Sequence, residues 1–283
     1  MQENIKICRI LKLRDDEDII KENLIYYYNI GVKDTFIMLH FPSEELIKKI
    51  EEVQILFPDN NIRLLYHNKE GKGFNPVNED YLRVLTNKAQ SEGFCWIIGS
   101  DADEFLILKK HEKIQDFIKE YNHYEIISLL FKWVNFYCLK EEKNSPFYEI
   151  MQYRNINFLP WTKSIGKFNK KMYFVQGLHH IGNMMYGQCN KKLKKEYIDS
   201  EIAYYAHFPY RSKEQFIKKN KNQALKFNDW RMKKINKDPD FFSKYWDELF
   251  KQKKWPNNLD KNDGEFNKKF IFDPIDGKLF KGI

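Results

Sequence analysis

The sequence predicts an α/β fold in which parallel strands alternate with crossover helices, followed by a helical C-terminal part. Three observations predict it. Apolar, strand-like runs alternate with amphipathic segments through the first hundred residues, short aromatic runs fill the middle, and the region after Ser212 has helical spacing. With 283 residues, 42% of them apolar and 16% aromatic, the chain can bury one sizeable core.

Four strands and three helices are expected in the first hundred residues. The strands are expected at residues 5–11, 35–39, 62–67 and 94–99, and the helices at residues 15–29, 43–56 and 76–92. Gly31 ends the first helix and Ser43 caps the second. Since ligands of open α/β sheets bind outside the carboxyl ends of the strands, a site is expected at that edge.

The middle of the chain predicts antiparallel or mixed strands, and the end predicts helices. The strand-like runs are residues 125–131, 134–139, 147–154, 172–176 and 201–208. Ser212 and Gln215 form a capping box for a helix that ends near Phe227, and residues 238–255 predict another amphipathic helix. We expect one domain at residues 1–210 and a basic helical extension at residues 211–283.

Charge is distributed unevenly along the chain. Residues 1–166 carry 22 Lys/Arg and 26 Asp/Glu, a net charge of −4, whereas residues 167–283 carry 26 and 14, a net charge of +12. The basic half indicates either an ordinary solvated surface or contact with an anionic partner, such as a membrane surface or a lipid diphosphate.

Cysteine spacing and the lengths of apolar runs bear on location. The four cysteines are far apart and form no zinc spacing, and Cys8 and Cys95 lie in apolar runs, which indicates buried reduced thiols. The N-terminus has no basic and apolar leader, and no run approaches the roughly 18 apolar residues of a membrane helix. We expect a cytoplasmic protein, with a peripheral position at the inner face of the membrane left open.

Three acidic residues, Asp101, Asp103 and Glu104, follow the fourth expected strand and precede another apolar run. In an extended turn, residues two apart project to the same side, so Asp101 and Asp103 can face one cation. Carboxylates suit Mg²⁺ or Mn²⁺, which complete their coordination with waters and substrate phosphates. Three acids between buried segments would repel one another without a cation, which favours a metal site over a solvated loop.

The segment CWIIGSDADEFLIL, from Cys95 to Leu108, resembles the strand and DxDEF motif of family-2-like glycosyltransferases with the GT-A fold, the group that includes the family-92 enzymes. The segments RDDEDIIKENLIYYYNIGVKDTFIML, TKSIGKF, GLHHIG and HFPYRSKEQFIKK are similar to other blocks of that group, so the resemblance covers roughly residues 5–220. It implies a Rossmann-like mixed sheet flanked by helices, and transfer of a sugar from a nucleoside diphosphate sugar to a hydroxyl group.

The resemblance also implies roles for individual residues. Asp101 and Asp103 match the acids that bind the metal and the diphosphate, and Lys163 and Lys167 match basic residues near the phosphates. A histidine often joins the metal in this fold. The candidates in this chain are His180 and His207. A neutral imidazole is a suitable ligand for Mn²⁺.

The nucleotide end of the resemblance is less complete. Arg14 and Glu17 match the charged pair beside the base and the ribose. After its second strand the group has an Asp, whereas this chain has His40, Phe41, Pro42 and Ser43. The identity of the donor nucleotide therefore stays open.

An inverting transfer needs a carboxylate that takes the proton of the acceptor hydroxyl. Glu104, Glu141, Glu142 and Glu149 all lie in suitable regions. We favour Glu149, because it lies inside the strand-like run 147–154, with Glu104 as the second candidate. Glu141 and Glu142 have the pattern of an exposed turn.

Two other function classes share parts of this pattern. A phosphatase or phosphotransferase of the haloacid-dehalogenase type places its Asp pair after the first strand and has Thr or Val where this chain has Phe105. A non-enzymatic protein that binds polyanions or a membrane surface fits the basic C-terminal part, but leaves the acidic group unexplained.

We therefore expect a hexosyltransferase-like enzyme of surface polysaccharide biosynthesis that uses Mn²⁺ or Mg²⁺. Its expected partners are a nucleotide-sugar donor, a glycan or lipid-linked acceptor and an anionic membrane surface, with no nucleic acid. The sugar and the acceptor stay open.

Overall fold

A computed structural model describes the backbone of residues 5–67, 75–125, 127–139, 145–168, 172–175, 178–183, 193–227, 229–256, 266–267 and 269–282. The chain divides into two compact units. The first unit comprises Met1–Trp133, Leu159–Ala206 and Lys278–Ile283, and the second comprises Val134–Phe158 and His207–Gly277. The domain boundary expected after residue 210 stays a prediction.

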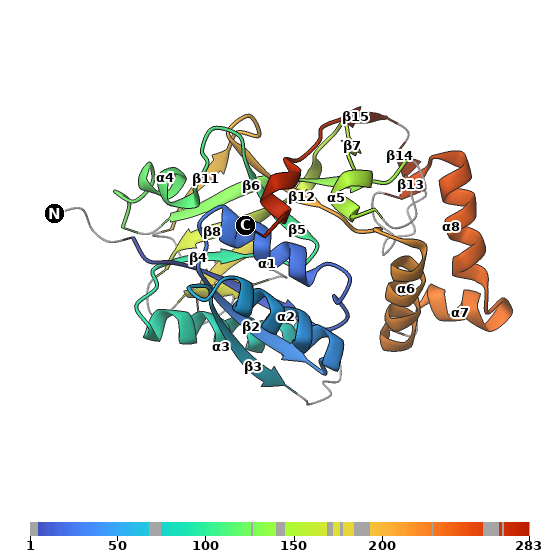
Figure 1. Cartoon of the computed structure of the whole chain (residues 1–283), viewed down its shortest axis with the longest axis horizontal. Helices are drawn as coiled ribbons and strands as arrows, with labels where there is room; N and C mark the ends of the chain where they lie inside the picture. The colour runs from blue at the N-terminus through green and yellow to red at the C-terminus, as the bar shows by residue number, and fades with distance from the viewer. Residues whose placement is uncertain are drawn as a thin grey trace. The chain divides into compact units, whose positions relative to one another are not determined.

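Figure 1 shows the course of the chain. The strands are β1 Ile7–Leu13, β2 Asp34–His40, β3 Asn61–His67, β4 Trp96–Gly99, β5 Glu104–Leu108, β6 Ile127–Tyr137, β7 Tyr153–Asn155, β8 Leu159–Lys167, β9 Met172–Val175, β10 His180–Asn183, β11 Lys194–Ile198, β12 Ala203–His207, β13 Trp255–Pro256, β14 Phe266–Asn267 and β15 Phe270–Phe272. The helices are α1 Ile20–Asn29, α2 Glu44–Leu56, α3 Asn75–Ser91, α4 Ile114–Lys119, α5 Phe147–Ile150, α6 Lys213–Phe227, α7 Trp230–Lys237, α8 Phe241–Gln252 and the 3₁₀ helix η2 Gly277–Phe280.

The first unit is built on a mixed sheet. Strands β4, β1, β2 and β3 lie side by side in this order and are all parallel. Strand β8 pairs antiparallel with β4, and β6 pairs antiparallel with β8. The predicted fold class, a mixed sheet flanked by helices, is confirmed.

Alternating residues of the strands face opposite layers of this unit. Cys8 and Ile10 of β1, with Phe36 of β2, pack into a core cluster that includes Leu85 of α3. The intervening residue Arg9 faces helix α1, and Figure 1 shows α1 and α2 next to each other against the sheet. The carboxyl ends of β1 to β4 therefore share one edge, flanked by helices on both faces.

The local sequence signals of the first hundred residues are confirmed. All four strands form within two residues of their expected starts, and Ser43 Oγ accepts a hydrogen bond from the Leu46 N–H (3.1 Å) at the start of α2. Gly31 has φ +97°, the left-handed conformation expected after α1. Helix α1 begins five residues later than predicted, because residues 15–18 form a loop. Cys8 is buried as expected, whereas Cys95 is only partly buried.

Two predictions for the middle of the chain are wrong. Residues 125–131 and 134–139 were expected as separate strands, but Ile127–Tyr137 is one continuous strand, β6. Residues 147–154 were expected as a strand, but Phe147–Ile150 forms a helical turn after Pro146, and only Tyr153–Asn155 is extended. Proline favours the start of a helix, and this local effect outweighs the β propensity of the aromatic residues.

The second unit contains strands β15, β7 and the end of β6, together with helices α6 to α8. Its core is aromatic, and Tyr210, Phe216, Trp246 and Trp255 contact one another there. The Gln215 N–H donates to Ser212 Oγ (3.1 Å), as expected of the capping residue of α6. The helices expected in the C-terminal part are present as α6 and α8, and α7 is an additional helix.

No helix in the described part of the chain is both long enough and apolar enough to cross a bilayer.

Candidate functional site

The acidic residues lie at residues 101–104, where the connection from β4 leads into Glu104, the first residue of β5, at the carboxyl edge of the parallel strands. We call this segment the acidic loop. A side chain at Gly99, just before it, would require its neighbours to move, because an added Cβ would lie 2.7 Å from Leu178 Cδ2 and 3.0 Å from Phe174 Cε1. These two side chains therefore pack closely against the end of β4.

A buried lysine joins two acids of the loop. Lys163 Nζ lies 2.9 Å from Asp101 Oδ2 and 2.9 Å from Glu104 Oε1. The side chains of Lys163 and Glu104 are each 1% exposed, whereas that of Asp101 is 50% exposed. Ile165 of β8 pairs with Ile98 of β4 in antiparallel register. If this register is extended by two residues, Lys163 lies opposite Ser100, just before the acidic loop. Pairing between distant strands thus supplies the positive charge that the loop lacks.

The protonation of this group follows from its burial. Burial raises the pKa of Glu104 to about 8; the charge of Lys163 acts in the opposite direction, and the nearby Asp101 and Asp103 raise it further. Burial lowers the pKa of Lys163, but the charges of Asp101 and Glu104 outweigh this effect and hold the pKa above its usual value. Lys163 is therefore a permanent internal cation, and Glu104 is the group of this cluster whose charge changes near neutral pH.

The structure also shows buried polar residues beneath the acidic loop that the sequence did not single out. Arg9, Asn23 and Ser100 have no exposed surface, and Tyr27 is 1% exposed. We call these four residues the support cluster. The signal for Arg9 was available, since it is a charged residue inside the apolar run of β1. Asn23 lies among the buried residues of α1, and nothing in the local sequence indicates its polar role.

Arg14, Glu17 and Lys167 occupy separate positions. Arg14 follows β1 at the carboxyl edge and lies 3.7 Å from Asp15, with half of its side chain exposed. Glu17 Oε1 accepts a hydrogen bond from Ser43 Oγ (2.6 Å), which ties the loop after β1 to the start of α2. Lys167 pairs with Trp96 at the opposite end of β4 and donates to the Asn122 carbonyl (3.0 Å). The structure therefore brings Lys163, but not Lys167, to the acidic loop.

Of two adjacent histidines, the first is the one whose surroundings include the charges of Lys163 and Asp101. His179 Nδ1 donates to the Thr162 carbonyl (2.6 Å), which leaves Nε2 with the lone pair. Burial lowers the pKa of His179 to about 4, the charge of Lys163 lowers it further, and the charge of Asp101 acts in the opposite direction. His180, the expected candidate, is exposed, and its charged neighbour is Lys195. His179 lies in the turn before β10 and His180 is the first residue of that strand, so the sequence alone could not tell which of the two lies near the acidic loop.

The other predicted site residues belong to the second unit. Glu149 lies exposed in the first turn of α5, so the argument that it is a charge inside a strand no longer holds. His207 Nδ1 donates to Asn135 Oδ1 (2.7 Å). Glu141 and Glu142 lie outside the described residues.

Aromatic rings lie at the carboxyl ends of β2 and β3, where the expected Asp is missing. The rings of His40 and His67 stack with centroids 5.9 Å apart, and the Tyr81 hydroxyl is hydrogen-bonded to His67 Nδ1. The backbone of Phe41 has φ +50°, a conformation that non-glycine residues rarely adopt and that is often found at functional sites.

The acidic loop offers donors that suit a hard cation. Asp101 is half exposed, whereas Asp103, two residues away, is only 7% exposed, and both carry carboxylate oxygens. Among the residues that the structure describes, no three His, Cys, Asp or Glu side chains form a group that could hold a metal. The donor set fits Mg²⁺ or Mn²⁺, since these ions are commonly held by one or two carboxylates together with substrate phosphates.

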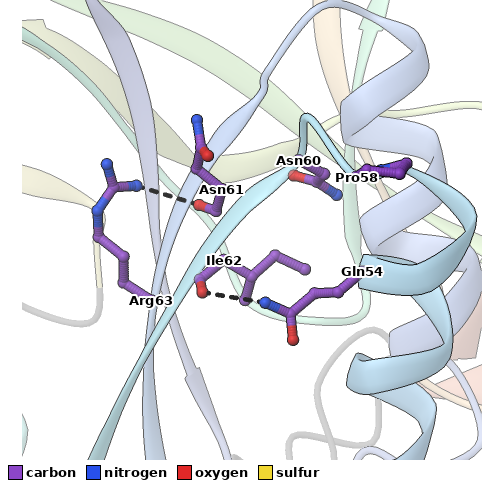
Figure 2. Close-up of a pocket in the computed structure, with 6 residues that line it drawn as sticks. All are labelled: Gln54, Pro58, Asn60, Asn61, Ile62 and Arg63. Atoms are coloured by element: carbon purple, nitrogen blue, oxygen red, sulfur yellow. Dashed lines mark hydrogen bonds between the residues drawn. The ribbon is translucent and has the colours of Figure 1, made fainter.

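A hollow of 330 Å³ lies elsewhere in the first unit (Figure 2). It is lined by Gln54, Pro58, Asn60, Asn61, Ile62 and Arg63. These residues surround the amino end of β3, the edge of the sheet opposite to the acidic loop, so the hollow is not part of the candidate site.

Comparison with known proteins gives one sequence family and distant structural matches. The sequence profile of glycosyltransferase family 92 matches residues 84–242. No curated protein sequence matches the chain.

Three solved structures illustrate the structural matches. One is the mannosyltransferase PcManGT from Pyrobaculum calidifontis in complex with GDP-Man and Mn²⁺, with 14% identity over 35% of this chain and 28% of that chain, and a TM-score of 0.28. The second is the apo structure of the bifunctional glycosyltransferase WbbM, with 10% identity over 47% of this chain and 24% of that chain, and a TM-score of 0.32. The third is HddC from Yersinia pseudotuberculosis, with 9% identity over 75% of this chain and 97% of that chain, and a TM-score of 0.38. The match spans about a quarter of the first two chains.

Proposed function

The chain belongs to glycosyltransferase family 92, and from this premise we propose that it is a metal-dependent enzyme that transfers a sugar from a nucleoside diphosphate sugar to a hydroxyl group. Family membership supports a transferase over the non-enzymatic alternative. One observation carries the finer proposal: a half-exposed Asp101 at the carboxyl edge of the sheet, held by the buried Lys163.

Asp101 and Asp103 would hold the metal, Mn²⁺ or Mg²⁺. When bound, the metal would neutralise charge on the diphosphate that leaves the sugar. A histidine ligand stays a prediction for His180 and His207, and the environment of His179 makes it a third candidate.

Lys163 has a different proposed role from the phosphate contact that the resemblance implied. Its ammonium is buried and donates to Asp101, so it orients this carboxylate, and it balances the charge that Glu104 carries above its raised pKa. Both oxygens of Glu104 are engaged, since Oε1 faces Lys163 and Oε2 accepts the Asp101 N–H (2.9 Å). The role of catalytic base stays a prediction for Glu149 and Glu104.

The nucleotide would lie across the carboxyl ends of β1 to β3. Arg14 and Glu17 are proposed to contact the base and ribose, in the loop after β1. The stacked pair of His40 and His67 offers a flat surface where the expected Asp is missing, and stacking on aromatic rings tolerates different bases. The proposed donor is therefore a nucleoside diphosphate sugar with no preference assigned to its base.

The acceptor is proposed to be a glycan or a lipid-linked sugar of surface polysaccharide biosynthesis, with inversion at the transferred sugar. We also propose that the protein acts at an anionic membrane surface. Residues 213–237, which include α6 and α7, carry nine basic residues and two acidic ones, a net charge of +7. Such a segment is attracted to anionic lipid headgroups by about 1 kcal/mol for each lysine or arginine near the surface.

Turnover of nucleotide sugars tests the proposal. A panel of UDP- and GDP-sugars is incubated with the protein and Mn²⁺, and release of the nucleoside diphosphate is measured. We expect turnover of one donor, lost with EDTA and reduced about 100-fold or more in Asp103→Asn. Asp116→Asn in α4 makes the same charge change at an exposed site and should keep the activity. Turnover that is unaffected by both EDTA and Asp103→Asn would contradict the proposal.

A further inference from the structure

The acidic loop rests on a buried hydrogen-bond network whose centre is a guanidinium group. Arg9 has no exposed surface, and a buried cation is costly unless its donors are satisfied. Its Nε donates to Ser100 Oγ (2.7 Å) and its Nη1 to Asn23 Oδ1 (2.5 Å). The planar guanidinium also lies 3.8 Å from the centre of the Tyr27 ring. All of these partners are themselves buried, so the network has one arrangement fixed by packing.

The donors of the support cluster converge on backbone carbonyls of the acidic loop. Arg9 Nη2 points to the Asp101 carbonyl (3.4 Å), and Asn23 Nδ2 donates to the Ala102 carbonyl (2.8 Å). The Glu104 carbonyl accepts from the Tyr27 hydroxyl (3.2 Å) and lies 3.4 Å from Asn23 Nδ2. Three of the four peptide groups that follow residues 101–104 are therefore oriented by side chains of β1 and α1.

Orienting these peptide groups also orients the two aspartates. The direction of each Cα–Cβ bond follows from the adjoining peptide planes, so the network sets where the carboxylates of Asp101 and Asp103 project. None of Arg9, Asn23 and Tyr27 needs to touch the metal or the donor for this effect. Outer contacts of this kind typically change metal affinity by about 10- to 100-fold.

We propose that Arg9, Asn23 and Tyr27 are positioning residues that hold the backbone of the acidic loop in the geometry with which Asp101 and Asp103 bind a divalent cation. This inference rests on the proposed function, because it takes the two aspartates as the metal ligands. It assigns a role to three side chains on β1 and α1 that lie outside the motif itself.

The chain provides a matched control for Tyr27→Phe and one for Arg9→Met. Tyr26 and Tyr27 are neighbours on α1 and are both 1% exposed, but the Tyr26 hydroxyl donates to the Leu106 carbonyl (2.9 Å), beyond the loop. Arg231 is also 1% exposed and lies in the second unit, where it binds Asp229 and Asn220. Tyr26→Phe and Arg231→Met therefore remove comparable buried bonds away from the acidic loop.

The test is Mn²⁺ binding, measured by electron paramagnetic resonance in the presence of GDP and, in parallel, UDP. Thermal unfolding first identifies a temperature at which every variant is folded. We expect Asn23→Leu and Arg9→Met to weaken Mn²⁺ binding about 10-fold or more, and Tyr27→Phe to weaken it by a smaller factor and to change the spectrum of the bound ion. Tyr26→Phe and Arg231→Met should lower only the unfolding temperature.

The outcomes separate this inference from the proposed function. If the unaltered protein binds no Mn²⁺ with either nucleotide, the metal-dependent function itself is overturned. If it binds Mn²⁺ and Asp103→Asn does not, but the support-cluster variants bind as tightly as the unaltered protein, positioning is overturned. Equal losses in the control variants would likewise overturn it. Should Arg9→Met fail to fold, Tyr27→Phe and Asn23→Leu decide the question.

Discussion

At the scale of single residues, the central feature is the buried contact of Lys163 with Asp101 and Glu104. The sequence placed all three residues near the site, but it assigned Lys163 to the phosphates. Its actual contacts depend on the pairing of β8 with β4, which joins residues about 60 positions apart. Local patterns carry no information on that pairing, so the internal cation could not be predicted.

Removing this cation should be costly. Lys163→Met leaves Asp101 and the buried Glu104 without their positive partner, and above about pH 8, where Glu104 is ionised, breaking a buried ion pair in this way typically costs about 3–5 kcal/mol. Urea denaturation at about pH 9 measures the free energy of unfolding in that range. Lys244→Met removes an exposed pair with Asp238 and should change stability little. A loss for Lys163→Met as small as that of the control would contradict the assigned role.

The raised pKa of Glu104 predicts how stability depends on pH in the metal-free protein. The ordinary pKa is 4.5, and the folded value is about 8, so between these values the folded chain holds a proton that the unfolded chain has lost. The free energy of unfolding should therefore fall as the pH rises through this range, and the contribution of Glu104 should be constant above it.

Substitution of Glu104 tests this dependence. In Glu104→Gln, the unfolding midpoint measured in EDTA should fall less between about pH 5 and pH 8 than in the unaltered protein. Glu149→Gln changes an exposed carboxyl and should keep the original slope. An unchanged slope in Glu104→Gln would show that this carboxyl has no raised pKa.

At the scale of elements, the prediction of helices and strands succeeded where the spacing of apolar residues and the helix-capping residues indicate the same element. Strands β1 to β4 and helix α2 have clear apolar patterns, and Ser43 and Gly31 mark helix ends. It failed at residues 147–154, where aromatic residues fit a strand and a short helix equally well. The candidate site shows the same difference between local and tertiary information. The acidic motif after β4 was visible in the sequence, whereas the residues of the support cluster come together only in the folded structure.

Helices α6 and α7 carry the prediction about the membrane surface. On α6, Lys218, Lys221 and Leu225 are exposed and are spaced three and four residues apart, so they share one face. We expect co-sedimentation with vesicles that contain anionic lipid, weakened about 30-fold or more by Lys218→Glu combined with Lys221→Glu. Binding should also fall as salt is raised.

A matched variant controls for net charge. Lys48→Glu combined with Lys110→Glu makes the same charge change at exposed sites of the first unit, and it should retain most of the vesicle binding. Equal loss in both double variants would indicate a general charge effect. Binding to duplex DNA as tight as that to anionic vesicles would contradict a membrane surface as the partner.

At the scale of the whole molecule, the predicted site residues divide between the two units. The acidic loop, Lys163, Arg14, Glu17 and His180 belong to the first unit, whereas Glu149 and His207 belong to the second. The family profile, residues 84–242, includes segments of both. Sequence order suggested a boundary near residue 210, but the second unit also takes residues 134–158 from the middle of the chain. A unit that is built from two separate stretches of the chain cannot be recognised from amino-acid composition.

The measurement that tests the central claim most directly is thermal unfolding with nucleoside diphosphates. We expect UDP or GDP to raise the unfolding midpoint only when Mn²⁺ is present, since a ligand at about 100 times its dissociation constant adds about 2.7 kcal/mol to stability. The shift should disappear in Asp103→Asn and persist in Asp116→Asn. A shift of equal size without Mn²⁺, or one retained in Asp103→Asn, would contradict the assignment of the acidic loop as the metal and diphosphate site.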